Sequence, residues 1–333
     1  MAEPDIALGT APRTEAREEA VAARPRSLDI VSHRNWFFLL SLLIIVPGIF
    51  SMARFGFLLG IDFAGGTELT LKFTNNPSIA QVESAAHSIS PDATVQQTAA
   101  GTFLIRTGTL SPAQQADFED TLSKRVGPID AGFTNVTSIG PTIAFETIRG
   151  AIVAVVSASL LILLYLAFRF RRTQGGWRSG FQFGGSALLA LLHDVFLLTG
   201  VFSILGKVLG LRVGEIDSLF LTAVLTVVGF SVHDTIVVFD RIRENMIVSQ
   251  RLSFEQIVNL SIMQTAARSI ITSFTVVLVL GALFLFGGDT LKGFSLALLI
   301  GVISGTYSSI FNAAPLLVVW RRMTAGGYRT ARA

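Results

Sequence analysis

The stretch Ala151-Ile-Val-Ala-Val-Val-Ser-Ala-Ser-Leu-Leu-Ile-Leu-Leu-Tyr-Leu-Ala-Phe168 contains no charged residue. The hydrocarbon core of a bilayer needs about 20 mostly apolar residues for each helical span. The stretch therefore predicts a helix that crosses a membrane, and five other apolar blocks in the chain predict the same. The six predicted spans run over Trp36–Ala53, Ala151–Phe168, Gly184–Leu205, Ser218–Phe239, Ile270–Phe286 and Phe294–Trp320.

The composition of the 333 residues agrees with this prediction, since 51% are apolar, 15% are charged and the mean hydropathy is +0.61. Soluble domains carry about 25% charged residues, so an ordinary soluble enzyme and a disordered protein are excluded. The absence of cysteine excludes a disulfide-stapled secreted domain. The net charge of +3 comes from arginines beside the apolar blocks, which argues for a membrane and against nucleic acid as a partner.

The positions of the arginines predict the orientation of the spans. Basic residues concentrate in the loop between the second and third spans, in the loop between the fourth and fifth, and after the sixth. Short loops rich in Lys and Arg face the cytoplasm. We therefore expect both termini in the cytoplasm and the long segment from Arg54 to Arg149 on the outer side of the membrane.

That outer segment has the pattern of a small α+β domain. Thr67–Phe73 alternates apolar and polar side chains with a period of two, which is typical of a strand. Ser111-Pro112 is a helix start with Ser at the N-cap. The full order, β-α-β-β-α-β, predicts a ferredoxin-like domain. Its six elements are expected at Thr67–Phe73, Pro77–Ile89, Thr94–Thr98, Thr102–Thr107, 111–126 and Gly132–Ile139, with Ala99-Ala100-Gly101 joining the second and third strands.

The sequence thus predicts a multi-span α-helical membrane protein with one ferredoxin-like α+β domain between its first two spans. Its parts are a disordered cytoplasmic tail (1–35), the first span (36–54), the extracytoplasmic domain (55–148), the other five spans (149–320) and a second cytoplasmic tail (321–333). The last span is long, and Pro315 is expected to kink it.

Asp234 is the strongest candidate functional residue. It lies in the fourth span about two turns from the boundary marked by Asp240 and Arg241, or roughly 9–10 Å at 1.5 Å per residue. A charged carboxylate at that depth is costly unless it faces the bundle interior, pairs with a cation or takes up a proton. We interpret Asp234 as a group that changes its protonation state; the alternatives are a fixed ion pair and an interfacial acid.

Arg268, at the start of the fifth predicted span, is a candidate partner for Asp234 because its long side chain enters from the same side. An interfacial anchor explains it equally well. His193, Asp194, His233 and Asn312 are further candidates for a relay or polar path, although a membrane histidine more often bonds a neighbouring helix. Gly301-xxx-Gly305 is interpreted as a close-packing face.

Enzyme motifs are missing from the sequence. It contains neither a phosphate-binding G-x-x-x-x-G-K-[ST] loop nor an H-E-x-x-H zinc helix. Gly229-Phe230-Ser231 resembles the start of a serine-nucleophile elbow, but the second glycine is absent. We therefore expect no catalytic residue, no bound metal and no cofactor.

Several motifs resemble those of the SecD/SecF family. Gly60-Ile61-Asp62-Phe63-Ala64-Gly65-Gly66-Thr67 is similar to the signature that opens the outer domain in this family, and Gly229–Asn245 is similar to its fourth-span motif. Arg268–Ser273 and Phe286–Gly288 are similar to its fifth-span region. The resemblance covers about Trp36 to Arg322. One departure is His233, where many SecF sequences carry Asn, which leaves the role of this side chain open.

The resemblance implies a protein of the bacterial inner membrane that works with SecD beside the Sec translocation channel, within the resistance–nodulation–division superfamily. Proton movement would drive the outer domains and promote release of exported polypeptides. Asp234 and Arg268 match the proton-relay positions, and Gly60, Asp62, Gly65 and Gly66 match the outer signature. H⁺ is the expected coupling ion, with Na⁺ as the alternative. For Gly65 and Gly66 a tight turn is the simpler interpretation.

Two other functions are compatible with the residues alone. One is a proton-driven exporter of lipids or hydrophobic small molecules, which would need an apolar pocket in the outer domain. The other is a membrane scaffold that transports nothing, in which Asp234 could be neutralised without harm.

Overall fold

The computed structural model describes residues 29–98, 101–173 and 175–329. Six helical segments in these residues are long and apolar enough to cross a membrane, as predicted. They are α2 (Arg34–Phe55), α6 (Pro141–Arg169), α7 (Gly176–Ser203), α8 (Ser218–Val248), α9 (Phe254–Phe286) and a last segment made of α10 (Asp289–Ser308) and α11 (Ala314–Arg329).

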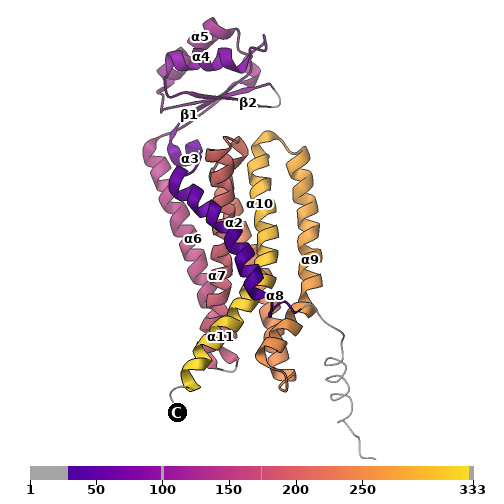
Figure 1. The fold of residues 1–333 in the computed structure, drawn as a ribbon. Coiled ribbons are helices and arrows are strands. Elements are labelled where there is room, and N and C mark those ends of the chain that lie inside the picture. Colours follow the sequence, from indigo (N-terminus) through magenta and orange to yellow (C-terminus); the bar gives the residue numbers. More distant parts are fainter. Residues whose placement is uncertain (1–28, 99–100, 174, 330–333) are drawn as a thin grey trace, which may run out of the picture.

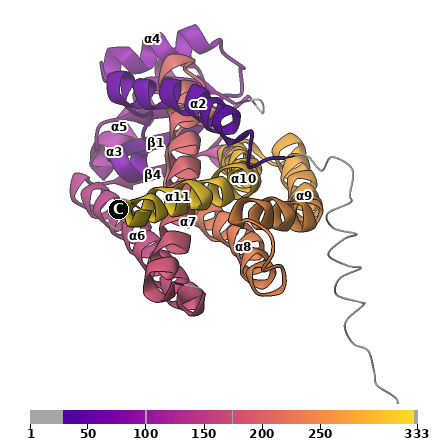
Figure 2. The same cartoon turned by 60° about the horizontal axis from the view of Figure 1, so that its bottom comes forward.

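The bundle has an inner and an outer set of helices. α7, α8 and α10 bury much of their surface against one another, whereas α2, α6 and α9 expose most of their apolar side chains. In the view from below, α7 lies between α6 and α8 (Figure 2). Apolar side chains that face outward all around a bundle are typical of contact with lipid.

Most helices extend beyond the predicted apolar spans. α9, for example, begins at Phe254 with Ser253 as its N-cap, 16 residues before the predicted start at Ile270. The hydropathy pattern locates the apolar centre of a helix, but polar turns at either end keep their helical hydrogen bonds. For the same reason the helices extend into the segments predicted as tails: α2 begins at Arg34, and α11 continues to Arg329. The remaining tail residues, 1–28 and 330–333, lie outside the described part of the chain.

The last span stays helical but changes its geometry near Pro315. Between α10 and α11 the chain makes a π-helical turn, Ser309–Ala313, which ends two residues before Pro315. Proline has no N–H to donate, and its ring collides with the carbonyl four residues earlier. The wider turn accommodates both effects, and it also carries Asn312.

A four-stranded antiparallel sheet with two helices lies at one end of the bundle (Figure 1). The strands are β1 (Gly66–Leu71), β2 (Thr94–Gln97), β3 (Phe103–Thr107) and β4 (Asn135–Ile139), in the spatial order β2-β3-β1-β4. The helices are α4 (Ile79–Ile89) and α5 (Pro112–Val126). The last predicted strand differs, because its first residues form a 3₁₀ turn, Ala131–Phe133. Of the predicted β2–β3 junction, Ala99 and Ala100 lie outside the described residues.

The two faces of the sheet differ in chemistry. Leu69 and Leu71 of β1 point toward α4 and α5 and form their core with Phe103 and Ile105 of β3. The opposite face presents Glu68, which pairs in register with Arg106. Side chains alternate along a strand, so Glu68 and Arg106 lie on the face opposite the apolar core. Both residues line a cavity with residues of the bundle, and α4 and α5 lie on the side of the sheet away from the bundle (Figure 1).

Candidate functional site

Asp194 is the most fully bonded carboxylate in the bundle. It lies on α7, is 1% exposed, and accepts hydrogen bonds from Ser231 Oγ of α8 (2.6 Å) and from Ser304 Oγ (2.6 Å) and Ser308 Oγ (2.7 Å) of α10. The Nδ1 atom of His193 lies 3.0 Å from the Asp194 carboxylate. Both oxygens of Asp194 therefore accept hydrogen bonds from serine hydroxyls of two other helices.

Asp234, on α8, is equally buried at 3% exposed but is poorly bonded. Its Oδ2 atom accepts one long hydrogen bond, 3.4 Å, from Thr306 Oγ1 of α10. Thr306 Oγ1 lies in turn 2.5 Å from Ser273 Oγ of α9. Nearby on α9, Ser269 Oγ is buried and has no hydrogen-bond partner among the described residues. Asp234 thus faces a seam of hydroxyls between α8, α9 and α10.

Arg268 is not brought to Asp234 in this structure. It lies in the middle of α9 rather than at its start, its side chain is exposed, and no ion pair joins it to Asp234 within the described residues. Arg268 nevertheless lies on α9, the helix that lines the hydroxyl seam. It is one turn before Thr272 and next to the buried Ser269.

The secondary candidates separate into different environments. His193 contacts Asp194, and its ring stacks on Tyr307 with centroids 6.2 Å apart. Asn312 instead bonds Ser41 of α2 through its Nδ2 atom at 3.0 Å. His233, the neighbour of Asp234 in the chain, is exposed on the surface of α8.

The outer signature residues lie where the sheet domain joins the bundle. Asp62, in the short helix α3 (Ile61–Ala64), accepts a hydrogen bond from the backbone N–H of Ser218 (2.9 Å), the first residue of α8. Gly65 and Gly66 have φ angles of +71° and +120°, which favour glycine, so the turn interpretation fits both. A Cβ atom on Gly60 would lie 2.7 Å from the Glu215 carboxylate, so this residue permits a close approach.

The serines around Asp194 are not recognisable as a set from the sequence. Ser231, Ser304 and Ser308 occur on two helices, and single serines are common in apolar helices. Gly301 and Gly305 do form a close-packing face, since Cβ atoms there would lie 2.1 Å from Val227 and 3.0 Å from Ser231 of α8. The spacing of these glycines was the available signal that α8 and α10 approach closely.

A bundle of six apolar helices with buried carboxylates at its centre and a small sheet at one end defines a multi-pass membrane protein. The chain belongs to the SecD/SecF family of protein-export membrane proteins. The C-terminal model of that family matches residues 119–323, and the model of its GG motif matches residues 50–77.

Relatives and solved structures agree with this assignment. The chain is 48% identical to the protein translocase subunit SecF of Thermobaculum terrenum, over 88% of this chain and 94% of that one, and 41% identical to SecF of Anaerolinea thermophila, with the same coverage. The crystal structure of SecDF from Thermus thermophilus, a translocon-associated membrane protein, superposes with a TM-score of 0.74 at 31% identity. It is matched over 92% of this chain, but this chain spans 41% of that one.

Proposed function

We propose that this chain is a SecF-type accessory subunit of the Sec protein-export machinery. In this proposal it works with a SecD-type subunit and uses the proton motive force to promote release of exported polypeptides on the outer side of the membrane. It has no enzymatic activity and needs no cofactor. The observation that carries the proposal is Asp234, a buried carboxylate in the centre of the bundle with one long hydrogen bond, in a chain of this family.

The contacts of Asp234 support a role in proton movement. A carboxylate in the membrane interior is costly unless it is paired or neutralised, and Asp234 accepts one long bond of 3.4 Å and lies near the hydroxyls of Ser269 and Ser273. Protonation would remove that cost, and the hydroxyls of Thr306 and Ser273 lie in line with it toward α9. Arg268 is proposed to approach Asp234 in another conformation, when the carboxylate is charged. A proton that crosses the membrane yields about 2.3 kcal/mol per 100 mV, enough to change a two-state equilibrium by a factor of tens.

The shape of the molecule supports one orientation. Both ends of the described chain lie at the end of the bundle opposite the sheet, as do the arginine-rich connection after α6 and the end of α8 (Figure 1). By the positive-inside rule we place that end in the cytoplasm and the sheet, a ferredoxin-like domain, on the outer side of a bacterial inner membrane.

The length comparison also supports a SecD-type partner. Because this chain spans 41% of the Thermus SecDF chain, we propose that the remaining part is supplied by a SecD-type protein in the same membrane. The exposed apolar faces of the outer helices offer surface for such a partner and for lipid. The Sec channel and exported polypeptides complete the proposed set of partners, and H⁺ is the proposed coupling ion.

The test is export of a secreted reporter in cells that lack the native subunit and carry wild type, Asp234→Asn or Arg268→Met. We expect Asp234→Asn to reach normal membrane levels and lose most of the stimulation of export. Glu244→Gln serves as a matched control, because it neutralises an exposed carboxylate on the same helix, α8, and leaves Asp234 and its contacts unchanged. Its export should stay close to wild type.

Normal export by Asp234→Asn would contradict the proton-coupled role and favour a scaffold. Dissipating the proton gradient distinguishes a role of Asp234 in proton movement from a role in helix packing. If export by wild type is insensitive to that treatment but Asp234→Asn is defective, the carboxylate serves packing rather than proton movement.

A further inference from the structure

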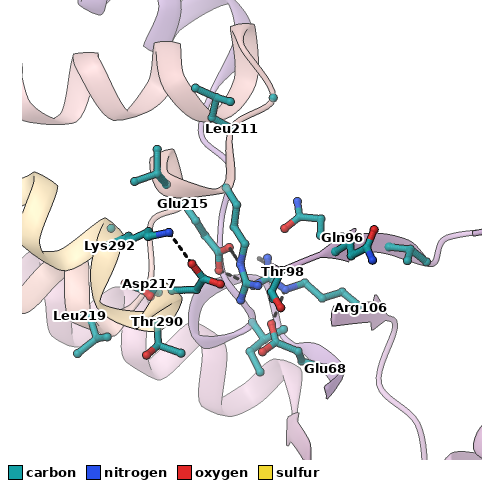
Figure 3. A pocket seen from close by; sticks show the side chains of 18 of the residues that line it. Glu68, Gln96, Thr98, Arg106, Leu211, Glu215, Asp217, Leu219, Thr290 and Lys292 are labelled. Carbon is teal, nitrogen blue, oxygen red and sulfur yellow. Dashed lines mark hydrogen bonds and ion pairs between the residues drawn. The ribbon is translucent and has the colours of Figure 1, made fainter. Parts of the chain in front are cut away.

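Arg106 joins the sheet domain to the membrane bundle. Its Nε atom donates to Glu68 Oε2 on the neighbouring strand β1 at 2.6 Å, and its second guanidinium nitrogen, NH2, donates to Glu215 Oε1 at 2.6 Å (Figure 3). Glu68 and Arg106 are paired in the strand register, so the sheet itself orients the guanidinium. Glu215 comes from the other part of the molecule, the turn that precedes α8.

Glu215 lies three residues before the start of α8, in a segment that is hydrogen-bonded on both sides. The next residue, Ile216, exchanges backbone hydrogen bonds with the segment after α2, through Ile216 N to Leu58 O and Gly60 N to Ile216 O, both 2.8 Å. Asp217 then caps α8 by accepting from Phe220 N at 2.7 Å. From its first residue, Ser218, α8 runs unbroken to Asp234, about 24 Å further at 1.5 Å per residue. A displacement of α8 therefore moves Glu215 with it.

The ion pair lies at a loosely packed junction. A cavity of about 710 Å³ lies beside it, between the polar face of the sheet and the loops at the outer end of the bundle (Figure 3). Its lining includes Gln96 and Thr98 on the sheet side and Leu211 and Lys292 on the bundle side. The junction is thus not a continuous apolar core, and the angle of the sheet depends on few contacts.

Burial opposes the charged forms of Glu215 and Arg106 at this junction. Burial raises the pKa of Glu215 above its ordinary value, against the opposing effect of Arg106. Burial lowers the pKa of Arg106, but the two glutamates outweigh it and the net pKa is raised. The desolvation of a buried ion pair offsets most of its attraction, so such a pair orients two surfaces more than it stabilises them. If the sheet moved away, both charges would return to water together.

We propose that Arg106 and Glu215 are the coupling residues of this protein: their ion pair holds the sheet domain against the start of α8, and its release frees the domain to move. The proposal rests on the proposed function in one respect, namely that events at Asp234 displace α8. In the closed position seen here, Glu68 keeps the guanidinium oriented and the Arg106–Glu215 contact is complete. A shift of α8 withdraws Glu215 from the guanidinium, while the sheet stays joined to the bundle by its chain connections at Gly65-Gly66 and Gly140.

The experiment measures the position of the domain directly. The chain contains no cysteine, so Asp117→Cys on α5 and Leu285→Cys at the outer end of α9 provide two unique sites for spin labels. Both positions are exposed and neither belongs to the junction. Label-to-label distances are measured by pulsed electron paramagnetic resonance on the full chain in lipid vesicles, with copurifying membrane subunits retained.

Without a gradient we expect Glu215→Gln to lower the ratio of closed to open populations by about fivefold or more, the range typical of coupled sites. Glu68→Gln is the matched control, since it removes a charge beside the same guanidinium, keeps an oxygen that can accept from Arg106 Nε, and does not touch the bundle. It should keep the distances of wild type. Arg106→Gln should act like Glu215→Gln, the double variant should add little to either, and Arg106→Lys should restore part of the closed population.

Wild-type distances in Glu215→Gln would overturn the proposal. So would an equal effect of Glu68→Gln, because Arg106 would then only stabilise the sheet. If Glu215→Gln does not accumulate in the membrane, Arg106→Gln gives the same reading from the other side of the contact. Because these distances are recorded without a gradient, they remain decisive even if Asp234→Asn exports normally and the proposed function fails.

Discussion

Asp194 and Asp234 are both carboxylates buried in the membrane part of the chain, and they differ in the number of their hydrogen-bond donors. Asp194 is surrounded by three serine hydroxyls and a histidine, from three helices. Asp234 has one long bond, although it is almost equally buried. Burial alone therefore does not distinguish a residue that holds helices together from one available for chemistry. The number and the length of the hydrogen bonds that a carboxylate accepts do distinguish the two roles.

The junction at Arg106 adds a third arrangement. There a buried carboxylate, Glu215, is paired with a cation from a different part of the molecule. Its hydrogen bond from Arg106 is short, 2.6 Å, like those of Asp194, but it joins the sheet domain to the bundle instead of holding three packed helices together. We infer that this kind of contact can open as a unit, which the Asp194 cluster cannot do without unpacking α7, α8 and α10.

The largest expected effect is on stability at Asp194. Asp194→Ala removes the carboxylate that accepts from Ser231, Ser304 and Ser308, and leaves Ser308 only its bond to the Gly305 carbonyl; an unsatisfied buried polar group costs about 1–3 kcal/mol. We expect a loss of about 3 kcal/mol or more in the free energy of unfolding, measured in mixed detergent micelles. Asp234→Ala should cost less than about 1 kcal/mol in the same assay, because little bonding is lost. Equal losses would show that donor number does not separate the two carboxylates.

A smaller effect is expected at Thr306, whose hydroxyl lies between Asp234 and Ser273. Thr306→Val keeps the shape of the side chain and removes both contacts. We expect a change below about 1 kcal/mol in the free energy of unfolding, since the bond to Asp234 is long. A loss above about 2 kcal/mol in the same micelles would mean that Asp234 is bonded as firmly as Asp194.

The smallest effect is expected at Asp92, an exposed carboxylate that separates the role of donors from that of burial. Hydrogen bonds from the Ser90 hydroxyl and the Gly108 N–H (2.9 Å) lower the pKa of Asp92 below its ordinary value. A lowered carboxyl pKa stabilises the folded state above about pH 4, and the stabilisation is lost as the pH falls through the folded value.

Asp92→Ala should therefore cost less than about 1 kcal/mol at neutral pH, because the site is screened by water. The difference from wild type should disappear near about pH 2, as followed by thermal unfolding. A difference that persists in acid would show that packing, rather than the charge, accounts for the effect.

The sequence alone was sufficient for the number of apolar spans and for the presence of a small sheet, because both depend on local periodicity. Alternation along β1 and uninterrupted apolar runs such as Ala151–Phe168 are properties of neighbouring residues. The ends of the helices could not be read in this way. Residues 254–269 of α9 are helical because of the Ser253 cap and packing against α8, although they are not uniformly apolar.

Local sequence also singled out Asp234 and Asp194, since a carboxylate in an apolar run is conspicuous wherever the chain goes. Only the tertiary structure decided which of them is satisfied. The donors to Asp194 lie 37, 110 and 114 residues away along the chain, and Arg106 reaches Glu215 across 109. Hydrogen bonds and ion pairs act over about 3 Å in space, so side chains this far apart in sequence meet only after the helices and the sheet have packed.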